Sequence, residues 1–400
     1  MNSRHIMAAF PPAADAQVTL ANWRQHPFSE WAFRNVRELL PTANITRSSE
    51  QAALCFSPLY LEDVSFADPR GDAIGLAAAL RASYTDGVVV SHRGQVVFEW
   101  YAHGLTPDTP HLIFSVSKSI AGTLGGILAD AGKLDVDAPV MHYVPEMKGS
   151  VYGDGCTVRH LLDMSVGIDF DEDYMAKQGD VVNYRRSTGW EPPDASIPPT
   201  HLRQYLQTLR PNGTPHGHTF HYVSTNTDVL GWVYERACGM SYAKIVSHYL
   251  WQPMGAEHDA CITVDSHGAA RVAGGISATV RDLARFGEMM RNHGVSNGRQ
   301  VVPGWWIDDI RHNGNAEAWS RGDLTKVFPN GNYRSKWYTI ERGRTPFAAV
   351  GIHGQWVYID PANETVIARV SSQALPMDLD LDHMWLRGYR AVASRLGGKT

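Results

Sequence analysis

The sequence predicts an α+β protein in which an antiparallel sheet flanked by helices carries an inserted all-helical lobe. Strand-like runs occur at residues 87–101 and return at 337–370, whereas the stretch 133–260 has helical periodicity. A chain of 400 residues is also longer than one simple core usually supports, which favours two lobes. A helical insertion into a sheet predicts a cleft, and therefore an active site, where the two lobes meet.

The expected division of the chain follows from these patterns. Residues 1–65 lack clear periodicity and are expected to form an N-terminal extension that wraps the body. A discontinuous α/β lobe is expected at 66–140 and 265–400, and a mainly helical lobe at 141–264. Within the helical lobe, about 167–200 begins acidic and then loses periodicity, which is typical of a lid loop.

The first lobe is predicted to start with a helix at 73–83 and a hairpin with strands at 87–91 and 96–101, leading to a buried helix that begins at about Ser115. In the inserted lobe, apolar periodicity predicts helices at 157–164, 229–238 and 242–251. The chain then returns as a helix at 281–293, strands at 337–340, 355–359 and 365–370, and a closing helix at 383–396.

Composition excludes several classes of function. The net charge is −5 and no Lys/Arg block occurs, so nucleic acid and acidic membranes are not expected partners. No apolar run reaches the ~20 residues of a membrane span, and the N-terminal apolar stretch is too short for a signal peptide, which predicts a cytoplasmic protein. His216, His218 and His221 lack acidic or cysteine partners at ligand spacing, so neither a metal nor a cofactor is expected. Reduced thiols are expected at Cys55, Cys156, Cys238 and Cys261.

The helix that begins at Ser115 carries the first chemical pattern. Residues three apart share a helix face, so Lys118 lies beside the Ser115 hydroxyl. An ammonium pushed into an apolar pocket loses its proton and then accepts that of the hydroxyl. The free N–H groups and positive dipole end of the helix N-terminus suit a developing oxyanion.

Two other patterns compete with this pair. Ser-x-x-Lys occurs again at Ser241 and Lys244, where we expect Ser241 only to cap a helix. Residues 294–298 match Gly-x-Ser-x-Gly, but a helix precedes them where the hydrolase elbow needs a strand, so a turn is predicted. Spacing alone does not separate the two Ser-x-x-Lys pairs.

Two further segments offer companions to Ser115. Tyr222 precedes a helix and could relay a proton, particularly if a neighbouring lysine favours its phenolate; the alternative is a buried tyrosine satisfied by one hydrogen bond. Around Ile352 and His353, flanking glycines allow a substrate to approach the backbone, and a strand N–H there could complete an oxyanion hole. The alternative for this segment is a turn with a solvated histidine.

Taken together and in this order, these segments resemble the serine β-lactamase and penicillin-binding-protein superfamily. They look more like its class C-like branch, in particular the 6-aminohexanoate-dimer (nylon oligomer) hydrolases and the family VIII esterases. The resemblance spans about residues 70–375 and rests in addition on the segments 157–162, 230–236, 249–255 and 282–286. It implies a β-lactamase/transpeptidase-like fold.

The resemblance also implies roles for individual residues. Ser115 would be the acylated nucleophile, Lys118 its base and Tyr222 the proton relay, with the oxyanion between the N–H groups of Ser115 and Ile352. Three further residues match the lid and pocket of the nylon-oligomer hydrolases: Tyr174, Trp190 and Ser224.

The chain departs from the β-lactamases in two places. It has Tyr222-Val223-Ser224 where they have Tyr-x-Asn, and His353-Gly354 where they have Lys-Thr-Gly. Both changes remove groups that hold a β-lactam. The sequence therefore predicts a serine hydrolase of short esters or linear amides such as 6-aminohexanoate oligomers, with a small-molecule substrate and a homodimer left open. The alternatives are a β-lactamase/peptidase-type enzyme and a non-catalytic ligand-binding member of the fold.

Substrate choice depends on charge near the pocket. The lid contains Arg185 and Arg186, and the expected wall residue Ala273 has no polar side chain. Like charge disfavours a substrate with an ammonium end, so we expect ester cleavage to exceed cleavage of the aminohexanoate dimer. The acidic run 169–173 could instead supply a carboxylate for that ammonium, and this alternative stays open.

Overall fold

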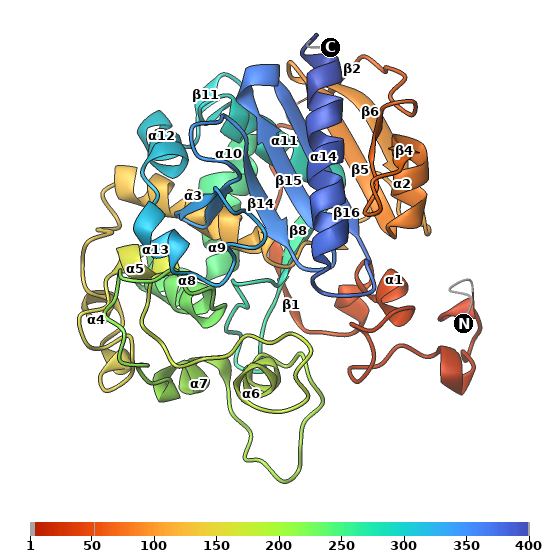
Figure 1. The fold of residues 1–400 in the computed structure, drawn as a ribbon. Coiled ribbons are helices and arrows are strands. Elements are labelled where there is room, and N and C mark those ends of the chain that lie inside the picture. Colours follow the sequence, from red (N-terminus) through yellow and green to blue (C-terminus); the bar gives the residue numbers. More distant parts are fainter. Residues whose placement is uncertain (1–4, 52, 399–400) are drawn as a thin grey trace.

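The computed structural model describes residues 5–51 and 53–398; residues 1–4 and 52 of the expected extension, and 399–400, lie outside the described residues. Its centre is an eight-stranded sheet in the order β12-β13-β14-β15-β16-β5-β6-β2 (Figure 1). Neighbouring strands are antiparallel except β2 and β6, a short parallel pair at one edge. The strands are β2 (Cys55–Phe56), β5 (Thr85–His92), β6 (Gln95–Tyr101), β12 (Asn332–Arg334), β13 (Trp337–Thr339), β14 (Phe347–Gly351), β15 (Gln355–Asp360) and β16 (Thr365–Ser371).

Helices cover both faces of this sheet. In β15, Val357 and Ile359 pack in one core cluster with α3 (Val116–Asp130) and α11 (Val280–Arg291). The alternate residues Trp356 and Tyr358 pack in another with α2 (Leu76–Ala82) and α14 (Leu379–Leu396). This alternation follows from the two-residue period of a strand, and it explains why the middle of β15, residues 356–359, is apolar without interruption. Figure 1 shows α14 crossing the face of the sheet opposite α11.

A smaller four-stranded sheet, which the sequence did not predict, leads to the start of α3. Its order is β1-β8-β9-β7, and β7 ends three residues before Ser115. The strands are β1 (Thr42–Ile45), β7 (His111–Leu112), β8 (Ala260–Thr263) and β9 (Ile276–Ala278). Such short strands give too few residues for a period to be recognised.

The helices predicted at 157–164 and 229–238 are present, whereas those at 140–143, 180–187 and 202–208 were not predicted. Thr157 caps α5 by accepting a hydrogen bond from the His160 N–H, as expected from the sequence. The predicted helix at 242–251 is interrupted, because a π-helical turn at Ser247–Trp251 separates α9 from α10. The helices are α4 (Val140–Tyr143), α5 (Val158–Leu162), α6 (Asp180–Ser187), α7 (Leu202–Thr208), α8 (Thr225–Cys238), α9 (Tyr242–Val246) and α10 (Gln252–Met254).

Two other predictions are corrected. The helix predicted at 73–83 starts at Leu76, because residues 73–75 pair as β4 (Ala73–Gly75) with β3 (Ser65–Ala67). The expected lid loop contains the helix α6. The remaining elements are α1 (Phe28–Ala32), α12 (Gly304–His312), α13 (Ala316–Ser320) and the hairpin strands β10 (Val295–Ser296) and β11 (Arg299–Gln300).

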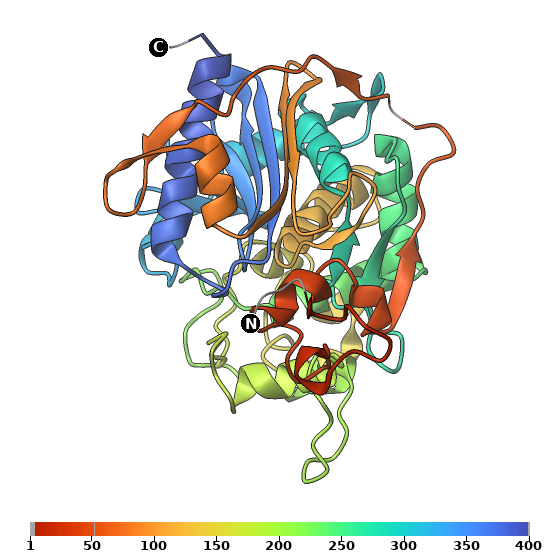
Figure 2. The same ribbon diagram turned by 90° about the vertical axis from the view of Figure 1, so that its right-hand side faces the viewer.

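The N-terminal segment packs against the turn that carries Ser115. Trp23 and Phe33 are buried in one cluster with Phe114 and Trp190, so the segment joins the lid to the start of α3. The Phe33 carbonyl also accepts a hydrogen bond of 2.7 Å from the Leu112 N–H. Figure 2 shows the segment beside the α6 region. None of the described helices is both long and apolar enough to cross a membrane.

Candidate active site

Ser115 lies at the start of α3, after a tight turn from β7. Phe114 has a φ of 43°, a left-handed conformation that is uncommon for a bulky residue and that clusters at functional sites. The Ser115 hydroxyl accepts a hydrogen bond of 2.8 Å from Lys118 Nζ, which also donates to the Ala273 carbonyl at 2.7 Å. Both Ser115 and Lys118 are buried, with exposures of 8% and 1%. The predicted pair therefore forms a direct contact inside the protein.

Close packing holds α3 in position. A Cβ atom on Gly122 would lie 1.9 Å from the Ser335 carbonyl oxygen, so only glycine allows the β12–β13 turn to approach the helix this closely. The Ser119 hydroxyl donates to the Lys336 carbonyl across the same contact. The glycines of α3 thus have a packing role that the motif alone did not reveal.

Burial is the main influence on Lys118. Loss of hydration lowers its pKa to about 8, with a smaller contribution from neighbouring Arg271, while the carboxylates of Glu172 and Asp228 oppose the change. A lysine with this pKa has a measurable free-amine fraction near neutral pH. It can therefore act as a general base toward Ser115.

Tyr222 completes the predicted set. Lys118 Nζ lies 5.0 Å from the centre of its ring, and Tyr222 lines the same cavity as Ser115 and Tyr338. Burial, helped by the Glu172 carboxylate, raises the pKa of Tyr222 above its usual range. The suggested phenolate is therefore not favoured, and Tyr222 is a neutral hydroxyl that can donate and accept a proton.

The end of β14 approaches the Ser115 main chain. A Cβ atom on Gly351 would lie 3.0 Å from the Ser115 nitrogen and 2.8 Å from the Ile113 carbonyl oxygen. Ile352 follows and lines the same cavity as Ser115. Within residues 5–51 and 53–398, the N–H groups of Ser115 and Ile352 take part in none of the turn and loop hydrogen bonds, so both are available to an oxyanion.

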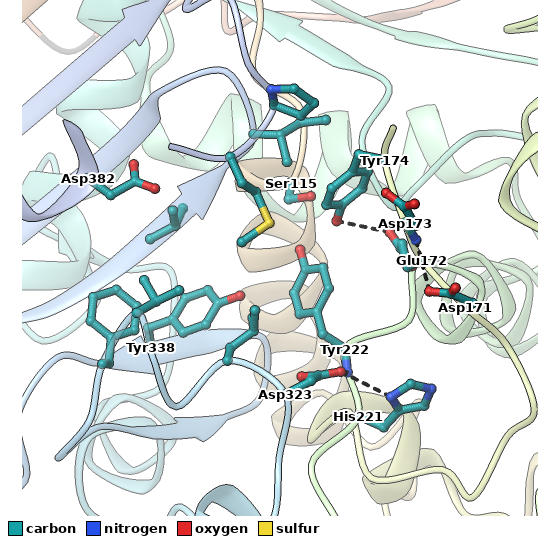
Figure 3. Close-up of a pocket in the computed structure, with 18 residues that line it drawn as sticks. Ser115, Asp171, Glu172, Asp173, Tyr174, His221, Tyr222, Asp323, Tyr338 and Asp382 are labelled. Atoms are coloured by element: carbon teal, nitrogen blue, oxygen red, sulfur yellow. Dashed lines mark hydrogen bonds and ion pairs between the residues drawn. The ribbon is translucent and has the colours of Figure 1, made fainter. Parts of the chain in front are cut away.

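Ser115, Tyr222 and Ile352 open onto a cavity of about 450 Å³ (Figure 3). One wall is apolar and includes Phe328 and Met377. The charged side chains are almost all acidic, and no lysine or arginine of the described chain lines this cavity. The acidic residues are Asp171, Glu172, Asp173, Asp323 and Asp382.

Glu172 organises the lid side of the cavity. Its carboxylate accepts hydrogen bonds from the main-chain N–H and hydroxyl of Ser224 and, at 3.1 Å, from the Tyr174 hydroxyl. Tyr174 lines the cavity as expected, whereas Ser224 lies behind Glu172. The open question about the acidic run is answered, because Asp171, Glu172 and Asp173 all line the cavity.

Two lid residues do not line this cavity. Arg185 is buried and donates to the carbonyls of Tyr174 at 3.2 Å and Ala176 at 3.0 Å, with its charge beside Glu191. Trp190 is 3% exposed, and its Nε1 donates to Thr263 at 3.1 Å. Arg185 therefore lies outside the lining of the cavity that contains Ser115, and its guanidinium satisfies main-chain carbonyls of the lid.

Ala273 and His353 also lie outside the cavity lining. Ala273 acts through its main chain, because its carbonyl accepts from Lys118 while its N–H donates to Asp228 at 2.8 Å. His353 is 3% exposed and pairs with the Gln373 carbonyl at 2.7 Å. Burial lowers the pKa of His353 to about 4, so it is neutral near pH 7 and supports the loop after β14.

Two residues near the catalytic set were missed by the sequence analysis. Asp228, one turn beyond Ser224 on α8, accepts from the Ala273 N–H and from the Tyr184 hydroxyl, and thereby holds the carbonyl that binds Lys118. Burial raises the pKa of Asp228. Tyr338, on β13, lines the same cavity as Tyr222. No local spacing links either residue to Ser115, so only the fold could reveal them.

The competing patterns are structural. Ser241 and Lys244 are both exposed, at the start of α9, and the expected cap is corrected, because the Ser241 side chain makes no capping hydrogen bond. Residues 294–298 form the β10–β11 hairpin, with positive φ at Asn297. His221 pairs with Asp323 at 3.0 Å, and the described chain contains no cluster of three or more metal-ligating side chains.

Comparison with known proteins identifies the family. Residues 67–389 match the beta-lactamase family. The chain is 39% identical over 365 residues to a 6-aminohexanoate-dimer hydrolase of Paenarthrobacter ureafaciens, covering 91% of each chain. Among solved structures, a candidate 6-aminohexanoate-dimer hydrolase of Bacillus anthracis superposes with a TM-score of 0.88 at 26% identity, covering 97% of this chain and 99% of that one.

A more distant likeness concerns the fold alone. A class C β-lactamase of Rhodobacter sphaeroides superposes with a TM-score of 0.55 at 17% identity, covering 80% of this chain and 99% of that one. The family match and the close relative both span most of the sequence and include the Ser115 helix and the Tyr222 segment. The chain therefore belongs to the beta-lactamase family and is a serine hydrolase of that fold.

Proposed function

We propose that Ser115 is the nucleophile and that the enzyme cleaves linear amides and short esters through an acyl-enzyme. One observation carries the proposal: the buried Lys118 amine, with its pKa lowered to about 8, contacts the Ser115 hydroxyl at 2.8 Å. A nucleophile next to a base, at a helix start with free N–H groups, is the arrangement that acyl transfer requires.

Each proton in the proposed reaction has a donor and an acceptor. Lys118 takes the Ser115 proton as Oγ attacks the substrate carbonyl, and the oxyanion accepts hydrogen bonds from the N–H groups of Ser115 and Ile352. Tyr222 donates its proton to the leaving nitrogen or oxygen as the bond to the carbonyl breaks, and is reprotonated by Lys118. Water then attacks the acyl-enzyme with the same groups as base and acid, releasing the carboxylic acid and restoring Ser115.

The acidic lining supports a substrate that carries an ammonium group. Glu172, Asp171 and Asp173 lie on the lid side of Ser115, with no lysine or arginine among the described residues that line the cavity (Figure 3). A buried ammonium requires such acceptors. We therefore revise the expected preference: linear amides and esters of ω-amino acids, including the aminohexanoate dimer named in the relatives, should be better substrates than neutral short esters.

We also propose a cellular location and an oligomeric state for the enzyme. All four cysteines are free thiols, which is consistent with the expected cytoplasmic location. A homodimer remains a prediction, and size-exclusion chromatography with light scattering tests it.

A trapping experiment tests the nucleophile. A p-nitrophenyl 6-aminohexanoate ester should leave a 6-aminohexanoyl group on the protein after an acid quench, visible in the intact mass. Peptide mapping should place it on Ser115. Adduct on another residue would reject the assignment, and nitrocefin turnover faster than that of the ester would favour the β-lactamase alternative. Absence of both adduct and turnover would favour the non-catalytic ligand-binding alternative.

A further inference from the structure

A second cavity of about 660 Å³ adjoins the active-site cavity. It lies between the N-terminal segment at 20–26, the lid, and the loop that follows β16. Tyr174 and Pro376 line both cavities, so the two share a wall. The reaction proposed above uses none of the residues that line only the second cavity.

The two cavities have opposite charge. The active-site cavity is lined by carboxylates, whereas the second is lined mainly by cationic groups with a single carboxylate among the described residues. Its charged and titratable lining residues are Arg24, His26, Lys177, Arg185, Arg186, Glu191 and His353. His353 is neutral near pH 7, because burial lowers its pKa to about 4.

Arg186 pairs with Asp194, which lies outside the cavity lining, so the buried positive charge in excess of carboxylates is that of Arg24 and Arg185. Glu191 pairs with both Arg24 and Arg185, so two guanidiniums share one carboxylate. Burial, together with Arg185 and Arg271 nearby, lowers the pKa of Arg24 to about 10, which still leaves it charged at neutral pH. The Nε atom of Arg24 is buried without a hydrogen-bond partner. Excess charge in such a place is costly unless an anion compensates it.

We propose that the second cavity binds the carboxylate end of a linear substrate whose scissile carbonyl lies at Ser115. This inference rests on the proposed function. The ammonium end of the same molecule would face Glu172 and its acidic neighbours in the active-site cavity. Guanidinium groups suit a carboxylate because they donate paired, charge-assisted hydrogen bonds. The substrate class is thus a zwitterion, an amide with an amine at one end and a carboxylate at the other, and the N-terminal segment contributes to its recognition through Arg24.

A matched pair of ligands tests the proposal: the aminohexanoate dimer and its terminal carboxamide, which differ only in the charge of one end. Calorimetry on the Ser115→Ala protein measures binding without turnover. Because the carboxamide lacks at least one charge-assisted hydrogen bond that the carboxylate makes, the dimer should bind more tightly than the carboxamide by about tenfold or more. Adding Arg24→Gln should remove this preference. Adding Arg70→Gln, which changes a surface arginine with 81% side-chain exposure, should preserve it.

Lys177→Gln provides a second variant in case Arg24 is needed for folding. Lys177 is exposed and lines the cavity, so its removal should reduce the preference by about twofold to threefold, as expected for a solvent-screened charge. Equal binding of the two ligands by the Ser115→Ala protein would overturn the proposal, as would equal losses with Arg24→Gln and Arg70→Gln. Hexanoate that binds without displacing the dimer would also overturn it, because the anion site would then be separate from the substrate.

Failure of the proposed function gives a different pattern. If the unmodified enzyme does not cleave the dimer while the Ser115→Ala protein still prefers it over the carboxamide, the carboxylate site stands and the proposed amide hydrolysis fails. If the enzyme cleaves the dimer and the carboxamide with equal kcat/KM and binds them equally, only the carboxylate site fails.

Discussion

The chain contains the same Ser-x-x-Lys spacing twice, and the two copies have different surroundings. Ser115 and Lys118 begin α3 inside the protein, whereas Ser241 and Lys244 begin α9 with both side chains exposed. Only Lys118 is desolvated, and desolvation is the largest cause of its lowered pKa. The spacing therefore makes the contact possible, while burial converts the amine into a base.

The largest expected difference is between the two serines. Ser115→Ala should lower kcat/KM for p-nitrophenyl esters by roughly 10⁴-fold or more, as for removal of a covalent nucleophile. Ser241→Ala should leave kcat/KM within about twofold of the parent, because an exposed serine that makes no capping hydrogen bond has little to lose. Circular dichroism checks that both variants stay folded. Comparable losses in the two variants would contradict the distinction drawn between the copies.

The lysines and Tyr222 come next. Lys118→Ala and Tyr222→Phe should each lower kcat by about 10² to 10⁴, the range of general acid–base catalysis. Because the proposed mechanism passes one proton between the two groups, the double variant should be little worse than either single one. Lys244→Ala is the matched control and should be silent. Multiplicative losses in the double variant would mean that Lys118 and Tyr222 act independently.

How much the sequence could predict follows the same distinction between local and long-range structure. The Ser115 helix, the β5–β6 hairpin and the Thr157 cap depend on neighbours along the chain, and all three were predicted. The walls of the cavity depend on which segments meet. Arg185 carries the same charge in any environment. The orientation of its side chain, however, is set by hydrogen bonds to the carbonyls of Tyr174 and Ala176, which no local pattern reveals.

The acidic run 169–173 is a second case in which the residues were visible in the sequence but their position in the fold was not. It was visible in the sequence, but whether it faces the substrate depends on the hydrogen bonds between Glu172 and Ser224, which are 52 residues apart. Asp323 and Asp382 come from segments still farther along the chain. The charge of Arg185 alone therefore does not describe the cavity that contains Ser115, whose charged lining is mainly acidic.

A smaller effect should come from the approach of β14 to Ser115. In Gly351→Ala the new methyl group would press on the Ser115 nitrogen and the Ile113 carbonyl oxygen, displacing the expected oxyanion donors. Since loss of one such donor costs about 10²-fold to 10³-fold, a displacement should lower kcat by about tenfold or more. Gly304→Ala is the control, because its Cβ would meet nothing closer than 3.9 Å. A Gly351→Ala enzyme with parental kcat would place the oxyanion elsewhere.

The smallest effect concerns the pH dependence that burial gives to Lys118. Its free amine is the active form, so kcat/KM for p-nitrophenyl acetate should rise with pH and level off above about 8. The Glu172 carboxylate stabilises the ammonium form and thus raises the pKa of Lys118. Glu172→Gln removes that charge, so the midpoint of the pH profile of kcat/KM should move to lower pH. Asp171→Asn removes a charge from the same cavity, but Asp171 is not among the groups that shift the Lys118 pKa, and it should leave the midpoint in place. The substrate is a neutral ester, so a change in the charge of the cavity does not alter electrostatic attraction of the substrate. A midpoint that moves equally in both variants, or upward in Glu172→Gln, would show that Lys118 is not the group whose deprotonation limits the reaction.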